Sequence, residues 1–347
     1  MSLDITFAYP GDLALKTGGY GYDRKLIEGL EALGWKVELL SLGDGFPSPS
    51  PEVLKEAERS LSALPDDALL LIDGLAFGVL DAWASREASR LRLAILVHHP
   101  LALETGLSQE ERLIFTERER RALSHAAQIF VTSAMTAREL VAGYDVDPQR
   151  LTIALPGTDR LGLAPRRGDP PMILSVGTLT RRKGHDVLVR ALKQIESLPW
   201  QACIVGAGTL DPRTADALEN LILSEGLSNR IKLAGEVEDT RLEMLNADIF
   251  ALASRYEGYG MVFAEALSHG LPIVGCATGA VPDVVPEEAG ILVPVDDVDA
   301  FTDALRRLLA DPHLRDEKAQ GSALAGEQLP TWAHTAAIFS SRLQDLT

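Results

Sequence analysis

The chain has 347 residues, of which 46% are hydrophobic and 24% charged, and its formal net charge is −17. This length exceeds one ordinary hydrophobic core, and the composition is that of a globular protein, so we expect two domains. The acidic balance argues against nucleic acid as a partner and against broad adhesion to anionic lipid, although a local basic patch would still permit weak peripheral membrane contact. The start Met-Ser-Leu-Asp lacks a basic region followed by an apolar one, so we expect a cytoplasmic protein.

Residues 5–155 alternate short apolar runs with helical stretches. The runs expected to be strands are ITFAYP (5–10), KVELLSL (36–42), ALLLID (68–73), LRLAILV (91–97), QIFVT (128–132) and LTIAL (151–155). Helices are expected over LIEGLEALG, closed by Gly34, and near 51–63, 76–88, 108–126 and 134–143. Thr17–Gly21 is expected to be a glycine loop. The alternation favours a parallel sheet with both faces covered by helices.

A second series of the same kind starts at residue 172. Its expected strands are MILSVG, ACIVG, IKLAG, DIFALA, PIVG and ILVPV, with helices near 185–197, 211–225, 239–246, 261–269 and 297–310. The segment 156–171 is rich in Pro, Gly and Arg without periodicity, which is typical of an interdomain linker. A last helix over 331–346 follows the second domain, and we expect it to return to the first.

Ligands of open parallel sheets bind beyond the carboxyl ends of the strands. The residues expected there are Gly18–Gly21, Asp73, His98-His99-Pro100, Thr132-Ser133, Gly177–Gly184, Gly206–Gly208, Gly235-Glu236 and 254–274. We expect two such edges to face each other across a cleft.

The stretch 254–274 reads SRYEGYGMVFAEALSHGLPIV and carries two acids eight positions apart, Glu257 and Glu265. Gly258 and Gly260 flank Tyr259, so the backbone can approach a ligand closely. The next helix should open near Met261 and expose N–H groups that attract anions. An acid within VFAEAL needs a polar partner, for which a sugar or ribose hydroxyl is suitable. The alternative is a plain buried helix after a glycine turn.

The loop from Gly177 to Gly184 contains three consecutive cations, Arg181, Arg182 and Lys183, between a strand and a helix. Arginine can grip two phosphate oxygens and lysine acts as a point charge, so the loop suits a diphosphate. The alternative is a solvated basic turn.

His98 and His99 end a strand, where a histidine can hydrogen-bond sugar hydroxyls or carry a proton. A structural histidine is the alternative, and only one of the two can point towards a ligand. No further His or Cys stands at metal-ligand spacing, and Cys203 and Cys276 indicate buried reduced thiols, so we expect no metal. The partial glycine fingerprints at 18–21 and 206–208 do not support a nicotinamide cofactor.

These motifs together resemble the family 4 retaining glycosyltransferases of the GT-B fold, which has two Rossmann-like, doubly wound α/β domains. The resemblance is carried by ADIFALASRYEGYGMVFAEALSHGLPIVGCATGAVPDVV (247–285), SVGTLTRRKGHDVLVRAL (175–192), AGILVPVDDVDAFTDALRRLL (289–309), TGGYGYDRKLIEGLEALGWKVELL (17–40) and TWAHTAAIFSSRL (331–343). It implies an acceptor-binding domain over 1–158 completed by the helix 331–347, a linker over 159–170 and a nucleotide-sugar-binding domain over 171–330.

The resemblance also implies roles for single residues. Glu257 would contact the transferred sugar, Glu265 the ribose hydroxyls, and Lys183 the diphosphate. Thr178 stands where many members have an arginine, so Arg182 would supply that cation. His98 would lie near the donor sugar and the acceptor. The remaining donor-binding positions implied are Gly18, Gly19, Gly177, Gly258, Tyr259, Gly260, Met261, Gly279 and Ala280, with Gly18 and Gly19 letting their loop approach the diphosphate and Ala280 donating its N–H.

The resemblance therefore implies an enzyme that moves a hexose from GDP-mannose, UDP-glucose or UDP-N-acetylglucosamine to an acceptor hydroxyl on a saccharide or lipid, without a metal. It fixes neither the donor nor the oligomeric state. Such an enzyme would act in glycan, glycolipid or cell-envelope polysaccharide synthesis. The alternatives are a non-catalytic nucleotide-sugar-binding subunit and, within the same fold, a sugar-nucleotide epimerase or a glucan synthase.

Overall fold

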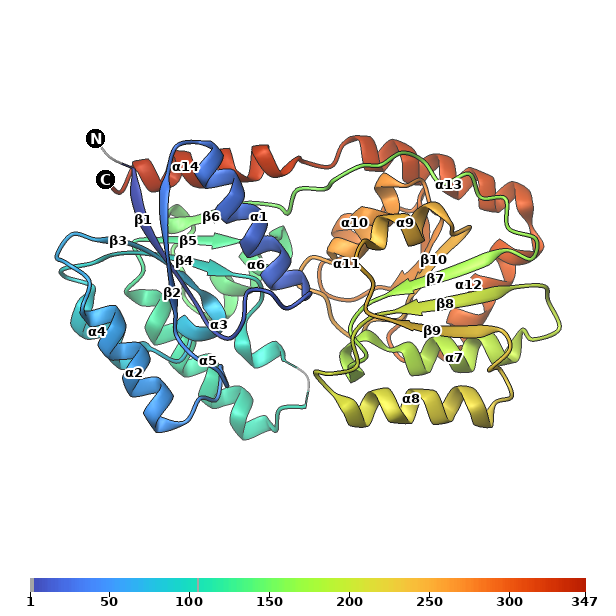
Figure 1. Ribbon diagram of the computed structural model, residues 1–347, viewed down its shortest axis with the longest axis horizontal. Coiled ribbons are helices and arrows are strands. Elements are labelled where there is room, and N and C mark those ends of the chain that lie inside the picture. The colour runs from blue at the N-terminus through green and yellow to red at the C-terminus, as the bar shows by residue number, and fades with distance from the viewer. Residues whose placement is uncertain (1–2, 105) are drawn as a thin grey trace. The chain divides into compact units, whose positions relative to one another are not determined.

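The chain, described here by a computed structural model over residues 3–104 and 106–347, folds into two compact units. Unit 1 extends to Gly157 and includes Pro330–Thr347, and unit 2 is Thr158–Leu329. Each unit has one six-stranded sheet with helices on both faces, as Figure 1 shows for each unit separately. The predicted α/β class with two Rossmann-like domains is confirmed.

The sheet of unit 1 is entirely parallel, in the order β2-β1-β3-β4-β5-β6. Its strands are β1 (Asp4–Tyr9), β2 (Lys36–Ser41), β3 (Leu69–Asp73), β4 (Arg92–Val97), β5 (Gln128–Val131) and β6 (Leu151–Ile153). Its helices are α1 (Gly18–Ala32), α2 (Pro51–Ser62), α3 (Gly74–Phe77), α4 (Asp81–Glu87), α5 (Gln109–Ser124), α6 (Ala134–Gly143) and α14 (Trp332–Gln344). The central strands β3 and β4 are almost wholly buried, which explains their continuous apolar sequences.

The predicted glycine loop at Gly18–Gly21 is wrong, because these residues form the first turn of α1. Thr17 caps the helix by accepting a hydrogen bond from the N–H of Tyr20 at 3.3 Å. A threonine N-cap is favourable enough to start a helix even where several glycines follow. The predicted helix begins only at Leu26, with the apolar run LIEGLEALG, so its start is placed too late.

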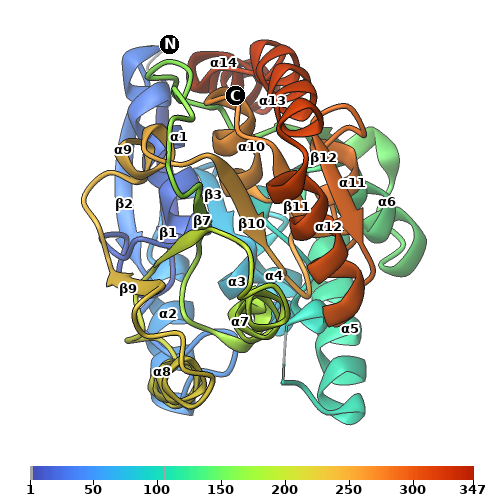
Figure 2. The same cartoon turned by 90° about the vertical axis from the view of Figure 1, so that its right-hand side faces the viewer.

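The helix α14 packs beside α1 in unit 1, as both views show (Figures 1 and 2). Phe339 stacks on Phe130 of β5 with 3.9 Å between ring centroids. The indole N–H of Trp35 donates to Ser340 at 2.9 Å, and the Thr335 hydroxyl donates to the Leu155 carbonyl at 2.7 Å. Through these contacts the last helix packs against unit 1, as expected.

The sheet of unit 2 is also parallel, in the order β12-β11-β10-β7-β8-β9. Its strands are β7 (Met172–Val176), β8 (Gln201–Val205), β9 (Ile231–Gly235), β10 (Ile249–Leu252), β11 (Ile273–Cys276) and β12 (Gly290–Val293). Its helices are α7 (His185–Gln194), α8 (Pro212–Ser224), α9 (Thr240–Leu245), α10 (Met261–Ser268), α11 (Val281–Val284), α12 (Val298–Ala310) and α13 (Pro312–Glu327). One apolar core joins the sheet to α7, α8 and α12, and a second joins its other face to α9, α10 and α11 (Figure 2).

The helix α13, which packs against α10, was not predicted. The helix is buried through small residues, Ala319, Ser322 and Gly326, so the usual apolar periodicity is absent. A Cβ at Gly326 would lie 2.5 Å from the Leu267 carbonyl oxygen. The segment 159–170 contains no helix or strand and groups with unit 2. Among residues 3–104 and 106–347, no helix combines the length and apolarity that crossing a bilayer needs.

Candidate functional site

The basic loop, Gly177–Gly184, connects β7 to α7 and ends in a short 3-10 turn over Arg181–Lys183. Gly184 has a left-handed backbone with φ of 64°, and a Cβ there would lie 1.9 Å from the Ala253 carbonyl oxygen. Only glycine fits this junction. The loop is thereby pressed against the end of β10, and Lys183 is brought to the residues that follow that strand.

A buried histidine contacts the start of the basic loop. His185 lies with Nε2 at 3.2 Å from the Gly177 carbonyl oxygen and Nδ1 at 3.4 Å from the Ser175 hydroxyl. Burial lowers the pKa of His185 to about 4, so the ring is neutral at physiological pH. It acts as a hydrogen-bonding spacer and adds no charge to the loop. The Lys183 methylenes pack over Gly177, where a Cβ would lie 3.0 Å from Cδ.

The acidic loop, Ser254–Gly260, connects β10 to α10 and carries Glu257. Glu257 is 5% exposed, and its Oε1 accepts hydrogen bonds from the Ser254 hydroxyl and from Lys183 Nζ, both at 2.6 Å. Arg182 lies 3.4 Å from Oε2. The structure thus brings together three of the four predicted catalytic residues, with Ser254 as a partner that the sequence analysis did not identify.

The charges in this cluster do not cancel. Burial raises the pKa of Glu257, but the charges of Lys183 and Arg182 outweigh burial and keep the pKa below its usual range. Burial lowers the pKa of Lys183, and the ion pair with Glu257 offsets this only in part. Two cations against one anion leave an excess of one positive charge, in a chain whose net charge is −17. The basic and acidic loops therefore form a local anion-attracting site within unit 2.

Arg255 ties the two loops together, and sequence reasoning missed it. Its guanidinium binds both carboxylate oxygens of Asp186 at 3.0 Å, Oδ1 of Asp296 at 2.7 Å and the Arg181 carbonyl at 2.5 Å. Its backbone N–H donates to the Arg182 carbonyl at 2.7 Å. A lone arginine after a strand gives no sequence signal for such a set of contacts, because all its partners are distant in the chain.

The expected role of Ala280 needs correction. Its N–H donates to the Glu257 carbonyl at 2.9 Å, so it is already used within the protein. Gly279 precedes it with φ of 52°, and a Cβ there would lie 2.1 Å from the same carbonyl oxygen. The segment 278–280 therefore packs against the backbone of the acidic loop at Glu257.

The other predicted residues of unit 2 lie around these loops. Thr178 follows Gly177, and its carbonyl accepts the Thr180 N–H at 2.7 Å. Gly258 and the buried Tyr259 form the bend before α10, and burial raises the pKa of Tyr259 to about 12. Gly260 is the left-handed N-cap of α10, with φ of 92°, and Met261 is its first residue, as predicted.

Glu265 lies on α10, one turn beyond Met261, as expected. Burial raises the pKa of Glu265 to about 7, although the charge of Arg241 lowers it, as does a hydrogen bond with Thr240. The side chain therefore sits beside the start of α9, and its carboxyl group is near half-protonation at neutral pH. Arg241 and Thr240 are thus the polar partners that an acid in an apolar helix requires.

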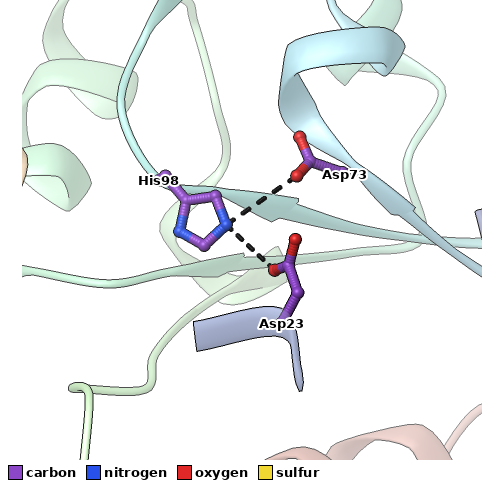
Figure 3. Close-up of side chains that lie close together, drawn as sticks. All are labelled: Asp23, Asp73 and His98. Carbon is purple, nitrogen blue, oxygen red and sulfur yellow. Dashed lines mark hydrogen bonds and ion pairs between the residues drawn. The ribbon is translucent and has the colours of Figure 1, made fainter. Parts of the chain in front are cut away.

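In unit 1, His98 follows β4 and lies among acids, whereas His99 pairs with Glu104 at 2.5 Å. Nε2 of His98 is 3.0 Å from Oδ1 of Asp23 and 3.8 Å from Oδ2 of Asp73 (Figure 3). Asp23 lies on α1 and was not predicted, because a helix that starts at Leu26 leaves it in a loop. Gly18 and Gly19 lie in the first turn of α1, and a Cβ at Gly19 would make an ordinary 3.5 Å contact with His98.

Residues 164–322 match the protein family described as glycosyl transferases group 1. Among curated proteins, the D-inositol 3-phosphate glycosyltransferase of Xylanimonas cellulosilytica is 32% identical over 241 residues, which are 63% of this chain and 57% of that protein. The protein of the same description from Corynebacterium efficiens is 28% identical over 290 residues, 76% of this chain and 68% of that protein. The chain thus matches little more than half of the first relative's length.

Solved structures share the fold over nearly the whole chain. Sucrose-phosphate synthase from Thermosynechococcus elongatus has a TM-score of 0.82 at 22% identity, covering 98% of both chains. HepE of Anabaena, solved in complex with UDP-glucose, has a TM-score of 0.78 at 15% identity, covering 98% of this chain and 99% of that one. At these identities the likeness establishes a common fold of two Rossmann-like units.

Proposed function

Because residues 164–322 match the family described as glycosyl transferases group 1, we propose that the chain is a glycosyltransferase that moves a hexose from a nucleotide-diphosphate sugar to an acceptor hydroxyl with retention of configuration. The observation that carries the proposal is the excess cation beside the buried Glu257. Breaking the glycosyl–phosphate bond adds a negative charge to the departing diphosphate, and fixed cations stabilise charge that develops there.

The geometry supports a division of labour within unit 2. Lys183 and Arg182 are held by Glu257 before any ligand arrives, so they need little reorganisation to meet a diphosphate. Glu257 is ionised and can accept hydrogen bonds from sugar hydroxyls. Glu265 lies near Thr240 on α9 and would bind the ribose hydroxyls. The N-terminus of α10 adds N–H groups that favour anions.

The proposed reaction needs no protein nucleophile. The acceptor hydroxyl attacks the face from which the diphosphate departs, and its proton passes to a leaving phosphate oxygen. The bond from the sugar to the diphosphate breaks as the new glycosidic bond forms. Within unit 2, Glu257 is the carboxylate nearest the cations, and its Oε1 is engaged by Lys183 and Ser254, which disfavours it as a nucleophile. A trapped glycosyl-enzyme adduct would contradict this mechanism.

The donor is best found with a thermal-shift panel of UDP-glucose, UDP-N-acetylglucosamine and GDP-mannose, because a ligand that binds only the folded state raises the melting temperature. D-inositol 3-phosphate belongs among the acceptors tested, since the names of the curated relatives include it. Transfer is then followed by the anomeric signals of the product. A protein that binds a donor but neither transfers nor hydrolyses it would be a non-catalytic binding subunit.

The ribose assignment has its own test. Glu265→Ala should weaken nucleotide binding by about 10-fold to 100-fold, the equivalent of a hydrogen bond to a charged group. Glu219→Ala, which removes an exposed acid of the same unit, is the matched control. Unchanged affinity in Glu265→Ala by calorimetry would remove the ribose role. Lys183→Ala should mainly lower turnover, because its charge matters most as the diphosphate departs.

A further inference from the structure

Three segments of unit 1 bring Asp23, Asp73 and His98 together. Asp23 comes from α1, Asp73 ends β3 and His98 follows β4. The acceptor atoms of the acids and the ring nitrogen all lie within 4.8 Å of one another. Asp23 is fully buried and Asp73 is 3% exposed. The acids are thus withdrawn from water and face a single ring.

The contacts distinguish the two nitrogens of His98. Both contacts to the acids end on Nε2, and the other ring nitrogen lies on the side away from the two carboxylates (Figure 3). A carboxylate accepts hydrogen bonds, so Nε2 carries a proton in the neutral ring as well as in the charged one. Nδ1 is then the nitrogen that gains or loses a proton. Among the described residues, no hydrogen-bond partner of Nδ1 is found.

The charges favour the protonated ring. Oδ2 of Asp23 is buried without a hydrogen-bond partner in the described part of the chain, so this carboxylate is poorly compensated. Burial lowers the pKa of His98, but the charge and hydrogen bond of Asp23 and the charge of Asp73 outweigh burial and leave the pKa raised. Burial and the charge of Asp23 raise the pKa of Asp73 to about 7.

We propose that Asp23 is a positioning residue: with Asp73 it holds the His98 ring so that a charged Nδ1–H is presented to an oxygen of the bound donor. The claim on the ring stands on the geometry of unit 1, and the part on the donor rests on the proposed glycosyltransferase function. Tyr22 packs its ring edge-on against His98, with centroids 5.3 Å apart, and limits rotation of the imidazole.

The neighbouring groups that could titrate are few. On α1 they are Tyr20 and Tyr22, whose pKa values are raised to about 12 and well above 10 respectively, first by burial. Asp12 and Asp44 act on Tyr20 from the flanking loops. The tyrosines stay neutral between pH 5 and 9, so a titration in that range belongs to His98 and Asp73.

The experiment is nitrogen NMR of the imidazole rings in the full-length, 15N-labelled chain, with His98→Asn used to assign the signals. We expect Nε2 to stay protonated from pH 5 to pH 9 while Nδ1 titrates. Asp23→Asn should lower the midpoint of His98 by at least about one pH unit, because it removes the nearest negative charge. Glu104→Gln is the matched control, and it should change His99 alone.

A proton on Nδ1 but not on Nε2 in the neutral ring would overturn the proposal, and so would an unchanged midpoint in Asp23→Asn. The tautomer is measured on the wild-type chain, so this measurement tests the proposal even if Asp23→Asn fails to fold. Metal analysis adds a separate outcome. A stoichiometric divalent ion bound to Nε2, removed by a chelator, would replace the proton-sharing cluster with a metal site.

The donor part is tested with ligands and kinetics. The Nδ1 signal should shift on adding the donor found in the panel, and inorganic pyrophosphate and free hexose then show which of its oxygens is responsible. The alkaline limb of kcat/KM should move to lower pH in Asp23→Asn by the same amount as the NMR midpoint. If the limb stays in place, Asp23 does not act through His98. Absence of transfer with every donor would count against the proposed function and leave the ring measurement intact.

Discussion

Separating Lys183 from Glu257 should reveal how strongly the basic and acidic loops depend on each other. The perturbation is a double-mutant cycle of Lys183→Met and Glu257→Gln. Lys183 Nζ lies 2.6 Å from Glu257 Oε1, and the two side chains are 11% and 7% exposed. Solvent screening is therefore weak, in contrast to the many surface ion pairs of this chain.

Removing one partner of a buried ion pair typically costs about 3 to 5 kcal/mol, because the other charge stays buried. In Lys183→Met, the acid keeps the Ser254 hydroxyl at 2.6 Å and Arg182 at 3.4 Å, which supports the lower end, about 3 kcal/mol. Glu257→Gln leaves Lys183 against Arg182, and we expect a similar loss. The double variant leaves neither charge of the pair buried and should lose no more than about 3 kcal/mol, so the coupling is at least about 3 kcal/mol.

The pH dependence has a defined sign. The folded-state pKa of Glu257 is lowered, so its contribution to stability is present above the pKa of the unfolded chain. It is lost as the pH falls through the lower, folded-state pKa. The single Lys183→Met variant should therefore be less destabilised in acid than at pH 7.

The assay is native-state hydrogen exchange on peptides of β7 and β10, since the chain has two units and one unfolding signal would mix them. The cycle is complete when all four proteins are compared at one pH. A coupling below about 0.5 kcal/mol would refute the reasoning, because distant or screened residues add independently within that margin. Exposed pairs such as Lys193 with Glu196 supply the reference value.

Three further changes test single residues. Between pH 4.5 and pH 7 the wild-type chain should lose about 2 kcal/mol of stability through Glu265, because its folded-state pKa is raised to about 7 and the unfolded chain ionises first. Glu265→Gln should abolish this loss, and equal pH profiles of hydrogen exchange in α10 peptides would contradict the reasoning. Gly279→Ala should cost about 2 to 4 kcal/mol through its contact with the Glu257 carbonyl, whereas Gly226→Ala, with φ of 72° in open space, should cost only about 1 kcal/mol for the left-handed backbone; similar melting temperatures would show that the acidic loop yields. Gly19→Ala should leave the melting temperature unchanged or slightly raised but weaken nucleotide binding, and calorimetry showing unaltered affinity would separate Gly19 from the donor.

Most of the fold could be predicted from the sequence because its strands are continuous apolar runs. All twelve expected strands are found near the expected residues, and the helix start at Met261 is confirmed. The failures concern segments where another interaction replaces apolar periodicity. At Gly18–Gly21 the helix is started by the threonine N-cap, and α13 is held by close contact through small residues.

The site could be predicted only where residues adjacent in sequence share one task. Arg182 and Lys183 stand together, and a basic run between a strand and a helix is visible in the sequence. The partners that orient them come from elsewhere, as Arg255 and Ser254 show. Asp23 could have been found by starting α1 at Thr17, which places it one turn after Gly19 on the helix. The roles assigned to Glu257, Glu265 and His98 remain predictions.

The packing of α14 against α1 has a consequence for how the chain folds during synthesis. Unit 2 is a single continuous segment, whereas unit 1 needs residues 330–347. Until these emerge from the ribosome, Tyr22 and Phe130 lack the ring of Phe339, and their apolar faces stay open to water. The later segment can thus finish folding before the earlier one. A nascent chain stalled before α14 should carry a folded unit 2 beside a unit 1 that chaperones still recognise.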